Sequence, residues 1–161
     1  MTGSNQKYDI WIKDAWILTM DEHFTEFKNA SILIKDGLIE HIGSVAHFEN
    51  LEAHQIIDAG RMILLPPFFN GHSHAAMSLL RGLGNDVPLL TWLQDYMWPA
   101  ESKYMNASNV RLGSLISGIE MIRSGTNIFT DMYFFEEEVA QACKDLGMRC
   151  ILGEGVLDFP T

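Results

Sequence analysis

The hydrophobic pattern of the chain changes at Pro66-Pro67, and this change limits the folds that the chain can adopt. Before the two prolines, short runs rich in β-branched residues alternate with turn residues, which is typical of antiparallel β-structure. After them, short apolar runs that read as strands are separated by longer helical segments, an order typical of parallel βα units. Because proline cannot donate to a sheet ladder, the pair also marks a break between strands. We therefore expect a β-rich region over residues 1–65 and the first βα units of a parallel sheet over residues 66–161.

The β-rich region contains a clear hairpin signal. Residues 31–35 and 38–42 are rich in isoleucine and leucine, and Asp36-Gly37 between them favours a tight turn with positive φ. Further strands are expected at residues 8–18, 55–58 and 62–65. Along the first of these, three apolar side chains share one parity, which predicts that they lie on one face of the strand: Ile10, Ile12 and Trp16.

The region after the prolines alternates between helical and strand-like segments. A long helix begins after Asn106 or Ser108, either of which can cap it, and extends to Arg123. Residues 136–146 have acids in the first turn and a glycine after the end, which predicts a second helix. The other expected segments are a short apolar strand at residues 68–71, a short helix at 75–83, an apolar segment at 89–98 that Pro99 ends, and strands at 127–133 and 148–152.

Composition excludes several classes of partner. Hydrophobic residues make up 47% and charged residues 20% of the chain, as in ordinary globular proteins. The net charge of −10 repels phosphate backbones, so we expect no nucleic-acid partner. The longest apolar run, residues 62–69, is too short to cross a bilayer, so we expect no membrane partner. Cys143 and Cys150 do not form a CxxC motif, and reduced thiols in a cytoplasmic protein are the simpler expectation.

His72 and His74 directly follow the apolar stretch at residues 68–71. Side chains two apart on a strand point to the same face, so the two imidazoles can bind one metal ion, and imidazole suits Zn, Fe or Ni. The carboxyl end of a parallel strand is also where active sites of α/β proteins form. A chain with six histidines can contain such a pair by chance, so the spacing alone leaves a purely structural pair open.

Residues 66–82 (PPFFNGHSHAAMSLLRG) resemble the metal-binding signature of the amidohydrolase superfamily. The resemblance is closest to the 5′-methylthioadenosine/S-adenosylhomocysteine deaminases. It continues in the same order through residues 86–93 (DVPLLTWL), 98–101 (WPAE) and 125–133 (GTNIFTDMY). It implies an α/β protein with a (β/α)8 TIM-type barrel, flanked by a small β-sandwich that is built from both chain ends.

By this resemblance, residues 1–65 supply the N-terminal strands of the sandwich, and residues 66–161 supply the first βα units of the barrel. A complete barrel needs roughly 250 residues, so the barrel is incomplete in this chain. The later metal-binding histidines and the groups that shuttle protons would lie downstream. We therefore expect no catalytic acid or base within this chain.

The same resemblance assigns roles to four residues. His72 and His74 match metal ligands at the end of the first barrel strand. Trp92 matches a residue that lines the nucleoside pocket, and Glu101 matches a carboxylate that receives the ribose 2′- and 3′-hydroxyls. A core aromatic is the alternative for Trp92, and a solvated helix cap is the alternative for Glu101.

Two further acids bear on the substrate. Some relatives carry an arginine that contacts the distal part of the substrate, and Glu154 stands at the matching position. An acid there would repel a homocysteine carboxylate, so a neutral 5′ group fits better. Asp131 lies at a strand end, and we expect it behind the metal ligands or in a structural role, because the family does not use it as a ligand.

The implied activity of the full-length protein is metal-dependent, hydrolytic deamination of an adenosine-type nucleoside. The candidate substrates are 5′-methylthioadenosine, S-adenosylhomocysteine and adenosine, with ammonia as a product. One divalent ion is expected, with Zn first and Fe or Ni as alternatives, and a homo-oligomer is left open. Another amidohydrolase activity, such as that of a triazine chlorohydrolase or a guanine or cytosine deaminase, is one alternative. A truncated, catalytically inactive fragment is the other.

Overall fold

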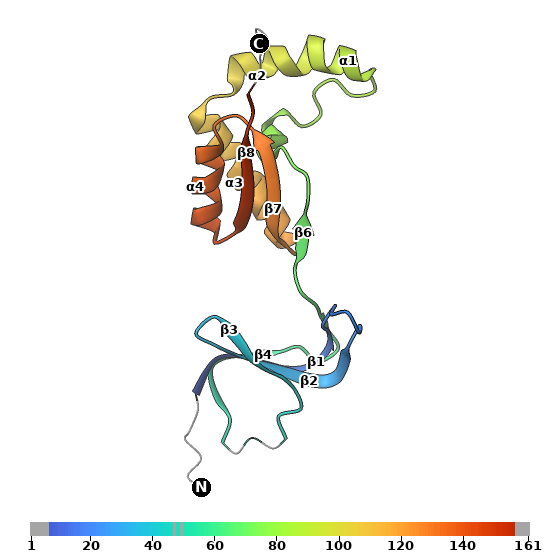
Figure 1. Cartoon of the computed structure of the whole chain (residues 1–161), viewed down its shortest axis with the longest axis vertical. Coiled ribbons are helices and arrows are strands. Elements are labelled where there is room, and N and C mark those ends of the chain that lie inside the picture. Colours follow the sequence, from blue (N-terminus) through green and yellow to red (C-terminus); the bar gives the residue numbers. More distant parts are fainter. Residues whose placement is uncertain (1–6, 47, 49, 157–161) are drawn as a thin grey trace. The chain divides into compact units, whose positions relative to one another are not determined.

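The computed structural model describes residues 7–46, 48 and 50–156 of the chain (Figure 1). The chain divides into two compact units, Met1–Pro66 and Pro67–Thr161. No helix within the described ranges is both long and apolar enough to cross a membrane.

The first unit is a five-stranded sheet with the strand order β3-β2-β1-β4, and its fifth strand, β5, pairs with β1. Its strands are β1 (Lys7–Leu18), β2 (Glu26–Lys35), β3 (Leu38–Gly43), β4 (Glu52–Asp58) and β5 (Ile63–Leu64). Neighbours β1, β2 and β3 pair antiparallel, whereas β4 and β5 pair parallel to β1. This sheet is the one layer that the described part of the unit forms, so a sandwich around it stays a prediction.

The predicted hairpin is confirmed. Asp36 and Gly37 both have positive φ, 51° and 76°, as a two-residue hairpin turn requires. The turn connects Lys35 to its partner Leu38, and this pairing fixes the register of β2 against β3.

The predicted face of the first strand is wrong beyond Ile12. The β1–β2 register shifts between Ile12 and Ala15 and again before Ile17, and Asp14 in this stretch has a φ of 62°. A bulge inserts an extra residue, and one extra residue moves every later side chain to the opposite face. Ala15 and Ile17 are therefore buried in the core of the unit, whereas Trp16 is 41% exposed.

The second unit contains a three-stranded parallel sheet with the order β6-β7-β8. Its strands are β6 (Phe68–Asn70), β7 (Thr126–Tyr133) and β8 (Arg149–Glu154). Its helices are η1 (Ala75–Leu80), α1 (Leu89–Thr91), η2 (Trp92–Met97), α2 (Trp98–Tyr104), α3 (Ala107–Arg123) and α4 (Glu136–Leu146). The core lies where α3 and α4 pack together against the sheet, around Val110, Phe129 and Val139. The parallel βα order confirms the α/β prediction.

The two long helices begin and end where the sequence predicts. Asn106 caps α3, because its side chain accepts a hydrogen bond of 3.1 Å from the backbone N–H of Asn109. Helix α4 spans the predicted residues and ends at Gly147, whose φ of 67° suits a left-handed cap. These boundaries depend on local signals, which explains why sequence patterns recover them.

Pro99 does not end the preceding segment, contrary to the prediction. Helix continues through α1, η2 and α2 to Tyr104, and Pro99 lies in the first turn of α2. The π-type turn of η2 shifts the hydrogen bonding, so that the N–H of Trp98 donates to the carbonyl of Leu93, five residues back. Proline lacks a backbone N–H, but the N–H groups in the first turn of a helix have no acceptor within that helix, so Pro99 is tolerated at the start of α2.

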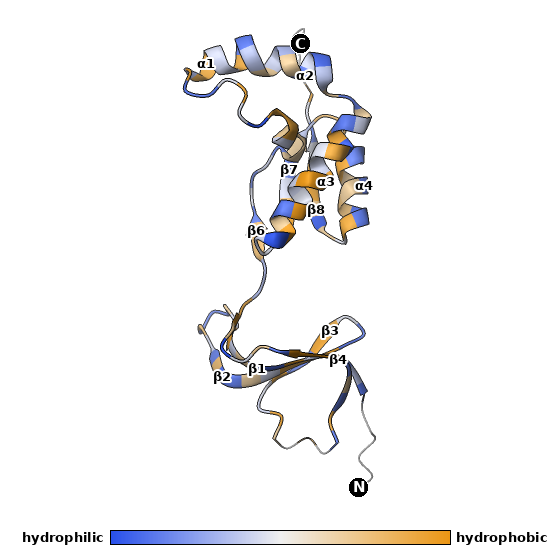
Figure 2. Cartoon of the chain, turned by 180° about the vertical axis from the view of Figure 1, so that it is seen from behind, coloured by the Kyte–Doolittle hydropathy of each residue, from blue (hydrophilic) through white to orange (hydrophobic). Residues whose placement is uncertain are grey.

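Helix α3 contains several apolar residues, coloured orange in Figure 2, whose side chains are partly exposed. They recur at helical spacing and are between 37% and 50% exposed: Leu112, Ile116, Ile119 and Ile122. Phe68 and Phe69 of the edge strand β6 are also more than half exposed, at 57% and 55%. The second unit therefore presents apolar surface along one edge of its sheet and on one of its helices.

Candidate functional site

The two histidines lie together at the carboxyl end of β6. His72-Ser73-His74 forms the connection between β6 and η1, and the centroids of the two imidazole rings are 5.1 Å apart with an interplanar angle of 81°. His72 is exposed, and His74 is half-buried. The structure therefore brings together the two side chains that the sequence paired.

One ring nitrogen of His74 is committed to a backbone partner. Its Nδ1 lies 2.6 Å from the carbonyl oxygen of Met132 at the end of β7. A carbonyl can only accept, so Nδ1 carries the proton, and a neutral ring then leaves a lone pair on Nε2. Metal-binding histidines show this arrangement, because a hydrogen bond from the second nitrogen fixes the ring and its tautomer. His74 thus fits a metal ligand, although no group of three or more potential ligands occurs among the residues described.

Asp131 of β7 holds the connection in place from behind. It is 4% exposed, and its Oδ1 lies 2.7 Å from Ser73 Oγ and 2.9 Å from the backbone nitrogen of Ala75. These contacts tie the residue before His74 and the residue after it to one carboxylate. The structural role expected from the sequence matches this geometry.

A second buried carboxyl, Glu136, lies at the start of α4 and close to Asp131. Burial is the main cause that raises the pKa of Glu136 to about 7, and the nearby charge of Asp131 adds to it. Burial likewise raises the pKa of Asp131, against the lowering effect of its hydrogen bond with Ser73. Near neutral pH, the two groups therefore carry fewer than two negative charges. In the sequence, Glu136 is one of several acids in a first helical turn, and no local pattern distinguishes it from Glu137.

Glu154 at the end of β8 caps helix α4. Its two carboxylate oxygens accept hydrogen bonds from the backbone N–H groups of Phe135 and Glu136, at 3.0 and 2.8 Å. An acid at a helix N-terminus satisfies free N–H groups and suits the helix dipole. Its neighbour Gly155, rather than Glu154 itself, lines the cavity beside His74.

That cavity brings three of the four predicted site residues together. It has a volume of about 280 Å³ and is lined by His74, Trp92 and Glu101, but not by His72. The rest of its lining is mainly apolar and aromatic: Met77, Leu93, Trp98, Met132, Tyr133, Phe134 and Gly155. Two of the predicted residues come from the helical segment 89–104 and one from the connection after β6, so the cavity joins segments distant in sequence.

Tyr133, which the sequence did not single out, connects two sides of the cavity. Its hydroxyl donates a hydrogen bond of 2.7 Å to Glu101 Oε1, and its ring centroid lies 6.3 Å from that of His74. Trp92 is held separately, by a hydrogen bond of 3.1 Å from its indole nitrogen to the carbonyl of Leu83. The predicted alternative of a freely solvated Glu101 therefore does not hold, because Glu101 is half-buried and bonded to a buried phenol.

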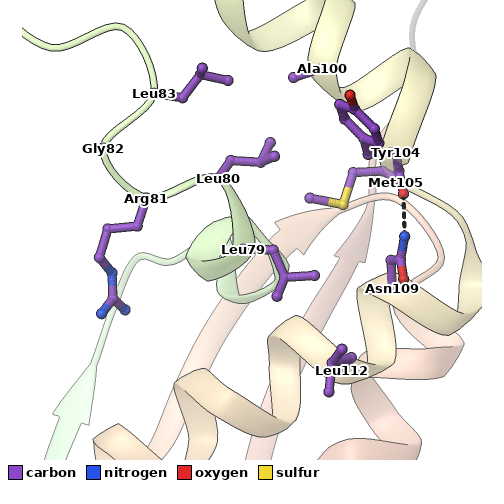
Figure 3. A pocket seen from close by; sticks show the side chains of 10 residues that line it. All are labelled: Leu79, Leu80, Arg81, Gly82, Leu83, Ala100, Tyr104, Met105, Asn109 and Leu112. Carbon is purple, nitrogen blue, oxygen red and sulfur yellow. Dashed lines mark hydrogen bonds between the residues drawn. The ribbon is translucent and has the colours of Figure 1, made fainter.

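A larger cavity of about 630 Å³ lies elsewhere, between η1 and helices α2 and α3 (Figure 3). Leucines 79, 80, 83 and 112 dominate its lining, and no histidine or carboxylate takes part. Its one cation, Arg81, makes a bidentate ion pair with Glu120 at 2.7 and 3.0 Å. This cavity is therefore larger than the one beside His74 but carries no candidate chemistry.

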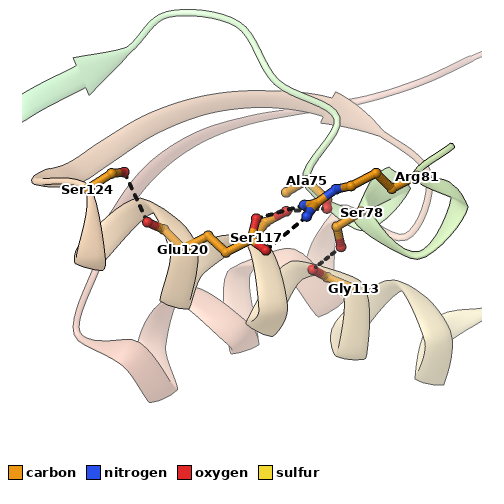
Figure 4. A network of polar contacts seen from close by, with 7 residues as sticks. All are labelled: Ala75, Ser78, Arg81, Gly113, Ser117, Glu120 and Ser124. Atoms are coloured by element: carbon orange, nitrogen blue, oxygen red, sulfur yellow. Dashed lines mark hydrogen bonds and ion pairs between the residues drawn. The ribbon is translucent and has the colours of Figure 1, made fainter.

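Contacts between η1 and α3 fix the segment that follows the histidines (Figure 4). Ser78 Oγ donates to the carbonyl of Gly113 at 2.8 Å, and Ser117 Oγ donates to the carbonyl of Ala75 at 2.7 Å. A side chain at Gly113 would overlap the backbone of Ala76, so the close approach of η1 requires glycine there. His74 thus lies at the start of a helix that is tightly held on α3.

The fold and the site together define a segment of a parallel α/β barrel with paired imidazoles at the carboxyl end of its first strand. Residues 63–160 match the model of the amidohydrolase family, and the chain belongs to that family. The predicted relation to this superfamily is confirmed.

Curated relatives cover almost the whole chain. It is 46% identical over 158 residues to a 5-methylthioadenosine/S-adenosylhomocysteine deaminase from Aquifex aeolicus, covering 97% of this chain and 34% of that protein. It is 43% identical over 151 residues to a 5′-deoxyadenosine deaminase from Methanosarcina mazei, covering 94% of this chain and 34% of the relative. The chain thus spans about a third of the length of these relatives.

Solved structures give the same picture of the fold. A zinc-bound adenosine deaminase from Xanthomonas campestris superposes with a TM-score of 0.90 at 28% identity, over 97% of this chain and 36% of that chain. A triazine hydrolase from Arthobacter aurescens superposes with a TM-score of 0.83 at 21% identity, over 95% of this chain and 37% of that chain. The second likeness shows the fold alone, and the shares covered agree with a partial barrel.

Proposed function

We propose that this chain forms the first part of a metal-dependent enzyme that removes the amino group of an adenosine-type nucleoside by hydrolysis and releases ammonia. The observation that carries the proposal is the cavity that joins His74, Trp92 and Glu101. An imidazole, an aromatic ring and a carboxylate are the groups needed to meet a metal, a heterocycle and a sugar diol. The relatives from Aquifex and Methanosarcina are named as deaminases of adenosine-type nucleosides, which supports the same substrate class.

His72 and His74 are the residues that would hold the ion, with Zn the first candidate because the Xanthomonas structure contains it. When bound, such an ion supplies Lewis-acid chemistry, which brings the pKa of a water molecule close to neutrality. Catalytic zinc sites use three protein ligands, so two imidazoles alone hold the ion weakly. We therefore infer that residues outside this chain complete the site, and that Fe or Ni remains an alternative ion.

The other residues of the cavity bind and orient the nucleoside. Trp92 offers an aromatic face to the base, and Glu101 accepts hydrogen bonds from the ribose hydroxyls. Glu154 caps α4 with both oxygens and adjoins the cavity residue Gly155, and its nearby negative charge favours a neutral 5′ substituent, as in 5′-methylthioadenosine or adenosine, over the carboxylate of S-adenosylhomocysteine. The proton transfers to the leaving amine fall to groups outside this chain.

The test uses a chimeric enzyme, in which this chain replaces the matching first third of the Aquifex aeolicus relative. Zinc content is measured, ammonia release is followed with adenosine, 5′-methylthioadenosine, guanine and cytosine, and chloride release is followed with a chlorotriazine. We expect ammonia from the two nucleosides and none from the free bases. Activity on the bases or the triazine alone would refute the proposal and favour another amidohydrolase activity.

The 161-residue chain is assayed in parallel. We expect no ammonia release from it, because the groups that complete the metal site and transfer protons are missing. Turnover by this chain at a rate comparable to that of the chimeric enzyme would contradict this expectation.

A further inference from the structure

We propose that Tyr133 is a positioning residue, which orients Glu101 toward a ribose diol and so sets a preference for ribonucleosides over 2′-deoxynucleosides. The inference rests on the proposed function, because Glu101 matters in this way only if a nucleoside sugar enters the cavity. Nothing in the sequence pattern assigns Tyr133 a role, and its contact with Glu101 joins residues that are 32 positions apart.

The contact between Tyr133 and Glu101 has the geometry of a strong hydrogen bond. The O–O distance of 2.7 Å is short, and a phenol that donates to an ionised carboxylate forms a charge-assisted bond. Burial and the neighbouring Glu101 raise the pKa of the Tyr133 hydroxyl above its ordinary value, so it keeps its proton. Tyr133 is 5% exposed, so its side chain is held by packing as well as by this bond. The phenol is therefore a permanent donor to one oxygen of Glu101.

Within the described part of the chain, the other oxygen of Glu101, Oε2, accepts no hydrogen bond. The Glu101 side chain lines the cavity. A carboxylate fixed through one oxygen presents the lone pairs of the other in a defined direction. A free glutamate would lose rotamer entropy when it bound the diol, and the bond from Tyr133 removes much of that loss beforehand.

The same strand end also positions the metal side of the cavity. The Met132 carbonyl accepts the hydrogen bond from His74 Nδ1, and the next side chain, Tyr133, holds Glu101. The Tyr133 ring also lies 5.0 Å from that of Phe134, centroid to centroid, which limits its movement. Two consecutive residues of β7 thus set the spacing between the imidazole and the sugar-binding carboxylate. A nucleoside must match this spacing if it is to place its base at the ion and its sugar at Glu101.

Tyr133→Phe tests the inference because it removes the hydroxyl and keeps the ring. In the chimeric enzyme, kcat and KM are measured with adenosine and with 2′-deoxyadenosine. We expect the parent to prefer adenosine at least about tenfold in kcat/KM, the ratio that corresponds to one hydrogen bond to a charged acceptor. We expect Tyr133→Phe to reduce the preference to about threefold or less, mainly by raising KM for adenosine. Glu101→Gln should reduce it similarly.

Tyr104→Phe is the matched control. Tyr104 lies on α2, only three residues from Glu101, but its ring contacts Lys103 and it lines the other cavity. We expect this variant to keep the preference of the parent. Circular dichroism and the melting temperature of every variant verify that the proteins are folded.

Each outcome decides between the inference and the function on which it rests. A parent with no preference for the ribose refutes the role of Glu101 in the proposed function, and the inference with it. A parental preference that Tyr133→Phe retains overturns the inference alone. Equal losses on both nucleosides in Tyr133→Phe also overturn it, because they indicate a packing role.

A binding measurement on the 161-residue chain makes the test independent of catalysis. Adenosine and 2′-deoxyadenosine are titrated at millimolar concentration, and the indole N–H signals of Trp92 and Trp98 are followed by NMR. We expect adenosine to bind more tightly, and we expect the difference to vanish in Tyr133→Phe. Equal binding of both nucleosides to the parent chain, or no binding of either, counts against the inference.

Discussion

The two units of the chain differ in whether their buried polar groups have hydrogen-bond partners. Among the described residues of the first unit, Ser31 is the buried polar one, and its hydroxyl accepts a hydrogen bond of 2.9 Å from the Trp11 indole. The second unit holds every buried side-chain oxygen that lacks a partner in the described part of the chain. These atoms belong to Ser114, Asn127, Asp131 and Glu136. Burying a polar atom without a hydrogen-bond partner lowers stability. The concentration of such atoms in the second unit therefore distinguishes the unit that holds the candidate site from the first unit.

The position of these atoms strengthens the contrast. Asp131 lies directly behind the His72-Ser73-His74 connection, and Glu136 lies directly behind Asp131. Functional sites retain unfavourable local features, such as buried carboxyls with raised pKa values, that a purely structural core would not contain. The sheet of the first unit shows no comparable cluster among its described residues. We therefore expect substitutions in the second unit to affect chemistry and pH dependence, and substitutions in the first to affect stability alone.

The largest expected effect is a loss of zinc binding and activity when a histidine is replaced in the second unit but not in the first. His74→Ala in the chimeric enzyme should lower the zinc content well below one ion per chain, because it removes a proposed ligand. It should also lower kcat/KM by a factor on the order of 1000. His54→Ala changes an exposed histidine of β4 in the first unit. It should leave both quantities unchanged. Elemental analysis and an ammonia assay measure the outcome, and equal effects of the two substitutions would remove the functional contrast between the units.

Two glycine-to-alanine substitutions, one in each unit, should lower the free energy of unfolding by different amounts, because only one of them causes a steric overlap. Gly113→Ala should lower the free energy of unfolding of the second unit by about 2–3 kcal/mol, because the new side chain overlaps the backbone of Ala76. Gly37→Ala in the hairpin of the first unit meets no atom within 4 Å but has a φ of 76°. Its cost should be about 1 kcal/mol, from the left-handed backbone alone. Urea denaturation of the 161-residue chain and of both variants tests this order, which the reverse ranking would contradict.

The pH dependence of stability should arise from the second unit. The pKa of Glu136 is raised in the folded protein to about 7, from an ordinary 4.5. Between these two values the unfolded chain loses its proton first, so the folded state binds more protons and stability falls as pH rises. Glu136→Gln should therefore remove a loss of about 3 kcal/mol between pH 4.5 and 8. Glu137→Gln, on the exposed side of the same turn, is the control and should leave the pH profile of unfolding unchanged.

The smallest expected effect concerns two serines. Ser31→Ala leaves the Trp11 indole without its acceptor, and should lower the free energy of unfolding by about 1 kcal/mol. Ser114→Ala removes a buried hydroxyl that has no partner, so it should be neutral or slightly stabilising. Thermal unfolding of both variants measures the difference. If Ser114→Ala is the more damaging of the two, the account of the unpartnered atoms in the second unit is wrong.

Sequence by itself determined the features that depend on neighbouring residues. The hairpin at Asp36-Gly37, the cap at Asn106 and the boundaries of α4 all follow from local backbone preferences, and the structure has each of them where the pattern predicts. The spacing of His72 and His74 also comes from the sequence, although the two residues lie in the connection that follows β6 rather than on the strand itself.

Tertiary structure decided the features that depend on residues far apart in the chain. The bulge at Asp14 turns Trp16 outward, and its position follows from the pairing with β2 rather than from the alternation of residues within β1. The helix runs through Pro99 because a π-type turn precedes it, which no apolar pattern indicates. The bond between Tyr133 and Glu101 exists because β7 and α2 meet at one cavity. Local periodicity records which face of an element is apolar, but only packing determines which side chains of different elements meet, and therefore which polar groups become a site.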